Sequence, residues 1–172
     1  MAPDLVVRRA RPNDALAISR LNNTFANEGQ MLRRTPETIA LAIDDYVVVQ
    51  DAQGTLLACG ALKEYSPSVA EVAAIAVARE AHGRGLGKAI VGAVEDLARK
   101  RGIFDLFALT LQPEFFARIG YERVDRARYP EKIRRDCLGC ARRFACNEIC
   151  FAKNLLAEEV PRAASRAASR AA

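Results

Sequence analysis

The chain has 172 residues, 51% of them hydrophobic and 27% charged, and its formal net charge is +5. This length fits one compact domain with a sizeable core, and so modest a charge, with arginines scattered apart from short pairs, does not favour nucleic-acid binding. The sequence has no run of about 18 apolar residues and no secretory leader, so we expect a cytoplasmic protein without a membrane span.

The first third of the chain predicts alternating strands and helices. Apolar residues recur at helical spacing from Ala15 to Phe25, and Thr35 followed by Pro36 provides an N-cap and a favourable first helical residue. Apolar and β-branched residues on both sides of a turn at Gly54 favour a hairpin. The expected elements are a strand at 6–9, helices at 15–25 and 36–43, and strands at 46–49 and 55–62.

In the centre of the chain, a predicted buried strand meets a helix across a glycine-rich turn. Residues 71–78 are apolar after the first residue, and residues 86–98 carry apolar side chains at helical spacing. Gly83, Gly85 and Gly87 lack a Cβ, so the backbone can adopt positive φ and bring its N–H groups against a phosphate at the positive end of the helix. The turn therefore predicts an anion cradle, although its spacing differs from both a Walker loop and a full GxGxxG fingerprint.

The rest of the chain continues the alternation and ends in a tail of low complexity. We expect a strand at 106–110, a short helix at 113–119, an outer strand at 122–124 and a last strand at 149–153. From Ala157 onward the chain consists mainly of Ala, Ser and Arg, with a repeated Arg-Ala-Ala-Ser. We interpret residues 5–155 as the folded domain and residues 157–172 as a disordered tail.

The five cysteines form a further pattern. An odd number of cysteines in a chain without a leader indicates thiols or metal ligands rather than a disulfide framework. Four of them are clustered as Cys137-x2-Cys140-x5-Cys146-x3-Cys150, and four thiolates can bind zinc tetrahedrally. The alternatives are reduced structural cysteines, with Cys150 facing the core of the last strand, or a redox-sensitive thiol pair. We favour these alternatives over a zinc site.

Residues 71–91 resemble motif A of the GCN5-related N-acetyltransferases (GNAT), in which a Gln/Arg-x-x-Gly-x-Gly/Ala turn binds the pyrophosphate of acetyl-CoA. His82 takes the first position of the pattern, where it departs from the usual residue, and Gly85 and Gly87 match the glycines. The resemblance implies an α/β fold: a mixed, mostly antiparallel central sheet flanked by helices, with a V-shaped splay of two strands at the acetyl-CoA site. The cofactor-binding residues that it implies are Ile75, Ala76, Val77, His82, Gly83, Arg84, Gly85, Leu86, Gly87, Lys88 and Phe116.

Acetyl transfer to an amine requires a base, a polarised thioester carbonyl and a proton for the leaving thiolate. Glu71 begins the core strand in an otherwise apolar run, where burial would raise its pKa, so we expect it to act as the base, directly or through water. The alternative is an exposed or ion-paired residue at a strand end. Many members of the family protonate the thiolate with a tyrosine that Phe116 replaces here. We assign this role to Thr110, for which the alternatives are a strand-end residue without function or Tyr121 as the acid.

Further signatures resemble the acetyltransferase domain of the N-acetylglutamate synthases over about residues 5–153. They are, in order, Arg8-Arg9-Ala10, Gly29-Gln30-Met31-Leu32-Arg33-Arg34-Thr35, Ala58-Cys59-Gly60-Ala61-Leu62, Ala70-Glu71, Leu106-Phe107-Ala108-Leu109-Thr110, and Phe115-Phe116 with Gly120-Tyr121. The resemblance implies L-glutamate as the amine substrate and a role in arginine biosynthesis. We expect a short, stand-alone form without the amino-acid kinase domain and its allosteric arginine site.

Three cations are candidates for binding glutamate. Its two carboxylates are each best held by a bidentate guanidinium. In the family an arginine of the loop at 29–35 holds a substrate carboxylate, which favours Arg34, and neighbouring side chains diverge, which makes Arg33 the weaker candidate. Lys63, just after the hairpin strand, is a third cation. The alternative for both arginines is a solvated loop.

The sequence thus predicts acetyl-CoA-dependent N-acetylation of L-glutamate, by a protein whose partners are small molecules rather than nucleic acid or membrane. Whether it forms a homodimer is left open. One alternative is a GNAT acetyltransferase for another amine, such as a polyamine, an antibiotic or a protein terminus. The other is a non-catalytic acyl-CoA-binding sensor, which Phe116 and the cysteine cluster would favour.

Overall fold

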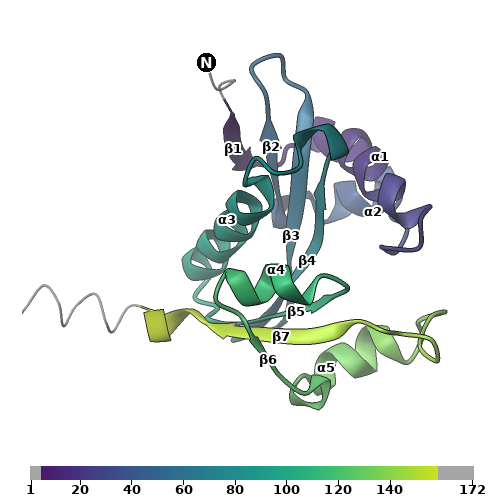
Figure 1. Cartoon of the computed structure of the whole chain (residues 1–172), viewed down its shortest axis with the longest axis vertical. Coiled ribbons are helices and arrows are strands. Elements are labelled where there is room, and N and C mark those ends of the chain that lie inside the picture. Colours follow the sequence, from purple (N-terminus) through teal and green to yellow (C-terminus); the bar gives the residue numbers. More distant parts are fainter. Residues whose placement is uncertain (1–4, 159–172) are drawn as a thin grey trace, which may run out of the picture. The chain divides into compact units, whose positions relative to one another are not determined.

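The computed structural model describes residues 5–158. Its strands form one sheet in the order β1-β2-β3-β4-β5-β7-β6 (Figure 1). The strands are β1 Val6–Arg9, β2 Tyr46–Gln50, β3 Leu56–Ser66, β4 Val69–Val77, β5 Asp105–Thr110, β6 Glu122–Arg123 and β7 Ile149–Asn154. The helices are α1 Ala15–Ala26, α2 Pro36–Leu41, α3 Leu86–Lys100, α4 Pro113–Arg118 and α5 Pro130–Lys132. Every predicted helix and strand is present, and the α/β class is confirmed.

The chain divides into two compact units. The described part of the N-terminal unit comprises residues 5–63 and 71–97, and that of the C-terminal unit comprises residues 64–70 and 98–158. The predicted 5–155 domain therefore includes residues of both units, and its boundaries stay a prediction.

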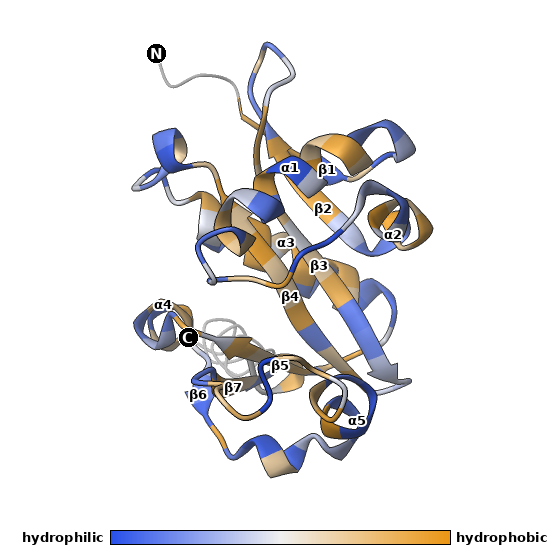
Figure 2. Ribbon diagram, turned by 90° about the vertical axis from the view of Figure 1, so that its right-hand side faces the viewer, coloured by the Kyte–Doolittle hydropathy of each residue, from blue (hydrophilic) through white to orange (hydrophobic). Residues whose placement is uncertain are grey.

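The core of the N-terminal unit lies on both faces of its strands. The pairs β1–β2 and β2–β3 are antiparallel, with Tyr46 opposite Ala61 and Val48 opposite Cys59. Helices α1 and α2 lie on one side of β2–β4 and α3 lies on the other (Figure 1). Figure 2 shows hydrophobic residues concentrated along these strands. Ile18 of α1 and Ile39 of α2 are completely buried in the cluster that covers the first face.

Helix α3 packs against the other face at a glycine. Its buried residues are those expected from helical spacing: Leu86, Ile90, Val91, Val94, Leu97 and Ala98. A Cβ built on Gly60 of β3 would lie 2.6 Å from the Ile75 side chain and would also collide with Ile90 of the helix. Gly60 therefore permits a helix-to-sheet approach that no other residue allows.

The core of the C-terminal unit is built from aromatic rings on the β5–β7 ladder. Phe107 of β5 lies opposite Ala152 of β7. The Phe107 ring stacks on Tyr129 with centroids 4.1 Å apart and meets Tyr65 at 5.5 Å. The Tyr129 hydroxyl donates a hydrogen bond of 2.9 Å to Asp105. Burial, together with the Asp105 charge, raises the pKa of this tyrosine. Helices α4 and α5 lie on opposite sides of the ladder (Figures 1 and 2).

The end of the described chain differs in detail from the prediction. Helix α5 was not predicted, and it continues into a π-helical turn, Ile133–Cys137. The last strand is confirmed and is followed by a short helical turn, Leu155–Glu158. Most of the predicted disordered tail falls on residues 159–172, which lie outside the described residues. No helix within residues 5–158 is both long and apolar enough to cross a bilayer.

Candidate functional site

The glycine turn has the conformation that a phosphate cradle requires. Gly83 and Gly85 have φ values of 75° and 76°, in the left-handed region that favours glycine. A Cβ built on either residue would meet nothing within 4 Å, so the space beside the turn is open. Leu86 begins α3 directly afterwards, and the first intrahelical bond runs from Ala89 N–H to the Gly85 carbonyl. The first amides of α3 are thus presented beside this open turn.

His82 folds back onto the preceding strand. Its Nε2 lies 2.9 Å from the carbonyl oxygen of Val77, and its ring stacks on Phe25 of α1 with centroids 6.5 Å apart. The Arg79 guanidinium also lies over the Phe25 ring, 5.4 Å from its centroid, and forms an ion pair with Glu28. His82 therefore contacts both β4 and α1, and these contacts stabilise the start of the glycine turn.

Strand β4 carries the predicted base and a local kink. Glu71 is 5% exposed, so the expectation of burial is confirmed. Three residues later, Ala74 has φ 53°, the only positive value at a non-glycine residue in the described chain. A left-handed residue inside a strand interrupts the ladder and redirects the next peptide groups. This interruption directly precedes Ile75–Val77, which the resemblance assigns to cofactor binding.

Cys59 of β3 faces the kink from the same unit. Its thiol lies 3.7 Å from the Ala74 carbonyl oxygen, to which it donates a weak hydrogen bond. The side chain is completely buried. Burial raises the pKa of this thiol to about 12, with a hydrogen bond from the Ala76 backbone and the charge of Arg34 acting in the opposite direction. Cys59 is therefore a neutral packing group.

Polar residues on the inner face of α1 hold the arginine loop. Ser19 Oγ and Asn23 Nδ2 donate to the Arg34 carbonyl at 2.8 and 3.0 Å, and the Arg34 N–H donates to Asn23 Oδ1 at 3.0 Å. Asn22 Nδ2 donates to the Leu32 carbonyl at 2.9 Å. Asn22 is completely buried, and its Oδ1 is the buried side-chain atom without a partner among the described residues.

The two loop arginines diverge, as expected for neighbours. Arg33 is exposed and donates to Asn27 of its own loop. Arg34 is half-buried, and its side chain lies close enough to the Tyr46 hydroxyl of β2 for its charge to act on that group. Burial raises the pKa of that hydroxyl, and the charge and hydrogen bond of Arg34 partly offset the rise. Arg34 is thus less exposed than Arg33, and its charge acts on the buried Tyr46 and Cys59.

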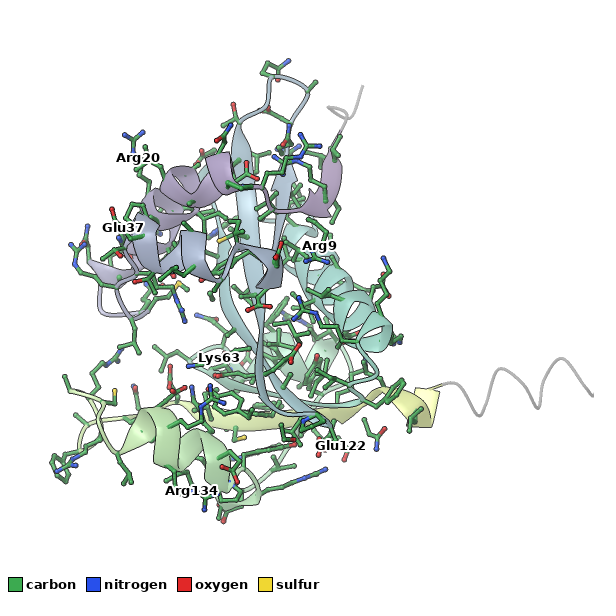
Figure 3. The ribbon with its side chains drawn as sticks, turned by 180° about the vertical axis from the view of Figure 1, so that it is seen from behind. Arg9, Arg20, Glu37, Lys63, Glu122 and Arg134 are labelled. Atoms are coloured by element: carbon green, nitrogen blue, oxygen red, sulfur yellow. The ribbon has the colours of Figure 1, made fainter. Side chains whose placement is uncertain are left out.

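Lys63 is the last residue of the N-terminal unit before the chain enters the C-terminal one. It is half-buried in β3, near the end of that strand (Figure 3). Its role as a third cation for the substrate stays a prediction.

In the C-terminal unit, Thr110 ends β5. It is 7% exposed, and its Oγ1 accepts a hydrogen bond of 2.8 Å from the Gln112 N–H. Since the oxygen accepts this bond, the hydroxyl proton remains to be donated elsewhere. The same bond also forms at the end of β5. Thr110 can therefore serve as a strand-end residue and still have a proton to donate.

Phe116 lies in the core of the C-terminal unit. It is 4% exposed and meets Tyr121 edge to face at 5.2 Å and Phe115 at 5.1 Å. Tyr121 is 3% exposed and occupies the position of a core ring. The Phe-x-x-x-Gly-Tyr spacing therefore brings the Phe116 and Tyr121 rings together in the core.

The cysteine cluster does not form a metal site in the described chain. Within residues 5–158, no group of three or more His, Cys, Asp or Glu side chains is placed to hold a metal ion. Cys150 is buried in β7, whereas Cys137, Cys140 and Cys146 are partly exposed and unpaired with one another by disulfides. Cys150 thus faces the core, as in the structural alternative.

Sequence reasoning missed Tyr46 and the polar face of α1. The signal was present, because Ser19, Asn22 and Asn23 are polar residues placed among the apolar positions of an amphipathic helix. Polar groups that a helix buries require partners, and here the partners are backbone groups of the arginine loop.

Three comparisons with known proteins bear on this geometry. An uncharacterized N-acetyltransferase of Chlorobaculum tepidum is 40% identical over 154 residues, which cover 90% of this chain and 99% of that protein. An amino-acid acetyltransferase of Mycobacterium tuberculosis is 34% identical over 122 residues, 70% of each chain. The crystal structure of N-acetylglutamate synthase from Neisseria gonorrhoeae, complexed with coenzyme A and N-acetyl-glutamate, matches with a TM-score of 0.80 and 27% identity. That match covers 90% of this chain but 36% of the Neisseria protein.

The family match agrees with the local geometry. Residues 17–123 match the Acetyltransferase (GNAT) family, a range that contains the arginine loop, the kinked strand and the glycine turn. Because this match extends over more than half of the sequence and a relative of nearly equal length is 40% identical, the chain belongs to the acetyltransferase (GNAT) family.

Proposed function

We propose that this acetyltransferase moves the acetyl group of acetyl-CoA to the α-amino group of L-glutamate, giving N-acetyl-L-glutamate and CoA. The similar Mycobacterium protein is an amino-acid acetyltransferase, and the similar Neisseria synthase was solved with coenzyme A and N-acetyl-glutamate. The observation that carries the proposal is the half-buried Arg34, beside Tyr46, in the unit that also holds Glu71 and the glycine turn.

Arg34 is suited to a carboxylate. A guanidinium that leaves solvent loses hydration, and a hydroxyl partner compensates only part of this loss. A substrate carboxylate can accept two parallel N–H bonds from the same fork. Because Ser19 and Asn23 fix the backbone of Arg34, the position from which its side chain extends is set before any substrate arrives.

The glycine turn fits the pyrophosphate of acetyl-CoA. Left-handed Gly83 and Gly85 leave open space beside the turn, and the amides that begin α3 are oriented for an anion. In the proposed reaction these amides orient acetyl-CoA, and backbone N–H groups after the Ala74 kink polarise the thioester carbonyl.

Glu71 accepts the proton of the attacking amine in this proposal, directly or through water. Its burial keeps competing water away, so that the carboxylate meets the amine rather than bulk solvent. Thr110 is proposed to donate a proton to the departing thiolate, which its hydroxyl can do while its oxygen accepts from Gln112.

The decisive experiment measures thiol release from acetyl-CoA with a panel of amino acids and amines, for wild type and two arginine variants. Hydrogen bonds to charged groups contribute about 1.5–3 kcal/mol, so Arg34→Ala should lower kcat/KM for glutamate roughly 10- to 150-fold. Arg33→Ala is the matched control, because that side chain binds Asn27 in its own loop, and it should change kcat/KM little. Arg34→Lys should recover part of the loss, since a point charge cannot make a two-pronged contact.

Two outcomes would overturn the substrate assignment. If Arg34→Ala turns over glutamate as well as wild type does, the carboxylate is held elsewhere. If wild type prefers an amine without a carboxylate, the protein is an acetyltransferase for that amine. Absence of thiol release with every acceptor would instead favour an acyl-CoA sensor.

A further inference from the structure

The open part of the glycine turn is short and lies between two residues with defined contacts. Leu86, which begins α3, is buried and belongs to the core. At the other end is His82, an exposed residue whose ring is nevertheless hydrogen-bonded. Gly83 and Gly85, between the two, have open space where a side chain would be. With Leu86 fixed in the core, the geometry of the turn depends on what holds His82.

Hydrogen bonds hold the segment that leads to His82. The Ala78 N–H donates to the Leu57 carbonyl of β3 at 2.8 Å, which fixes where the segment begins. The His82 N–H donates to the Arg79 carbonyl at 3.2 Å, and Nε2 of its ring lies 2.9 Å from the Val77 carbonyl oxygen. Because a carbonyl oxygen can only accept, Nε2 carries the proton of this bond. The imidazole therefore ties the segment back to the end of β4.

The ring of Phe25 is the second contact of this imidazole. The two rings are nearly parallel, with an interplanar angle of 10°, and their centroids are 6.5 Å apart. This separation lies within the range in which offset stacked rings attract each other. The same Phe25 ring lies under the Arg79 guanidinium. One side chain of α1 thus contacts two residues of the segment that joins β4 to the glycine turn.

Phe25 is itself fixed. It is buried, in the cluster that also contains Ile18 of the same helix and Ala76 of β4. Its backbone carbonyl accepts the N–H groups of Glu28 at 3.2 Å and Gln30 at 3.0 Å, which closes the C-terminal end of α1. A ring whose backbone is held in this way, and which packs in a dense core, can keep the imidazole in one orientation.

We propose that Phe25 is a positioning residue for acetyl-CoA. Its ring holds the imidazole of His82, and His82 holds the first amides of the glycine turn in the conformation that receives the pyrophosphate. Phe25 acts through His82 and not by contact with the cofactor. Without the ring, the turn populates other conformations, and the apparent affinity falls with the fraction of molecules that keep the competent one. This inference rests on the proposed placement of acetyl-CoA at the turn.

The test measures, by calorimetry, the dissociation constants of CoA and of pantetheine, which lacks the pyrophosphate and the nucleotide. Phe25→Leu keeps an apolar side chain in the core and removes the ring. It should weaken CoA binding about 2- to 10-fold, the factor that an aromatic pair contributes, and leave pantetheine binding unchanged. In thiol release from acetyl-CoA, the same variant should raise KM and leave kcat nearly unchanged, because the lost interaction serves binding.

A double-mutant cycle tests the route through His82. His82→Ala should also weaken CoA binding, and adding Phe25→Leu to it should weaken the binding little further, because the contact between the rings is already lost. Ile18→Val is the matched control. It removes a methyl group from the same buried cluster, so it should lower Tm and leave the affinity for CoA unchanged.

The possible failures are distinguishable. Additive losses in the double variant, or wild-type CoA affinity in Phe25→Leu, would refute the role of Phe25 even though wild type binds CoA more tightly than pantetheine. Equal losses for CoA and pantetheine would refute it as well, since they indicate a general defect of the fold. If wild type binds CoA no more tightly than pantetheine, the placement of acetyl-CoA at the turn is wrong, and this inference falls with it.

Discussion

At the scale of single residues, two carboxylates are buried among the described residues, and only one of them is proposed to react. Glu71 in β4 is 5% exposed and Glu95 in α3 is 7% exposed. Both belong to the N-terminal unit, yet Glu71 lies three residues before the kink and Glu95 lies in the middle of a helix. Substituting each of the two residues separates the loss of the proposed base from the loss of a buried carboxylate.

Glu71→Gln keeps the shape of the side chain and removes the proton acceptor. Loss of a general base lowers kcat roughly 10²- to 10⁴-fold, and the loss should shrink at high pH, where more of the amine is already deprotonated. Glu95→Gln should affect folding to a similar extent but leave the pH profile of kcat unchanged. Near wild-type turnover of Glu71→Gln at neutral pH would show that Glu71 is structural.

Cys59 predicts how stability depends on alkaline pH. Its folded pKa of about 12 exceeds the ordinary value of 9.0 because burial disfavours the thiolate. The folded state therefore holds the proton more tightly, and this contribution, about 4 kcal/mol at most, is complete below pH 9 and is lost as pH rises toward 12. Urea unfolding between pH 8 and pH 11 should show a steeper fall for wild type than for Cys59→Ala. Equal slopes would contradict the prediction.

At the scale of elements, the contact between α3 and β3 depends on Gly60. Gly60→Ala places a methyl group against Ile75 and Ile90, and overpacking of a filled core costs about 1–3 kcal/mol. The free energy of unfolding, measured by denaturant titration, should fall by this amount. Gly92→Ala in α3 is the control: its Cβ meets nothing within 4 Å, so the better helix propensity should stabilise the protein by about 0.8–1 kcal/mol. If both substitutions changed the free energy of unfolding in the same direction, the close contact of α3 with β3 at Gly60 would be refuted.

Hydrophobic periodicity predicted the helices and strands well, because it depends only on residues that are near one another in the sequence. The apolar spacing from Leu86 onward depends only on helix geometry, and each of these residues is buried. The kink at Ala74 could not be predicted, since alanine has no preference for positive φ and adopts it here only in its tertiary context. The π-helical turn that ends at Cys137 and the position of Arg34 beside Tyr46 likewise depend on contacts distant in sequence. The resemblance indicated Arg34, and the folded structure shows which buried residue its charge acts on, Tyr46.

At the scale of the whole molecule, Leu155 marks how far the C-terminal end of the chain can be deleted without loss of stability. Leu155 is completely buried, and its N–H donates to the Phe104 carbonyl at 2.9 Å. Residues 159–172 are mainly Ala, Ser and Arg, and Val160 is their only large apolar residue, which is too little apolar surface to build a core.

Deletion of residues 159–172 should therefore leave activity and Tm almost unchanged. Deletion from Leu155 onward removes a buried leucine and should cost about 2–5 kcal/mol, as large-to-small core substitutions do. Thermal unfolding of both truncated proteins beside the full chain tests this contrast. An equal loss of Tm in both would show that the tail contributes to the fold.

The hydrogen bonds from α1 to the arginine loop also bear on the thermodynamics of binding. Ser19, Asn22 and Asn23 fix the loop backbone at Leu32 and Arg34 in the free protein. The conformational entropy of this segment is thus lost during folding, whereas a disordered loop would lose it when the ligand arrives. Such a receptor is preorganised. Calorimetry of an amino acid binding there should show a small heat-capacity change without the large unfavourable entropy of coupled folding, and association should be fast, since no slow conformational step precedes it.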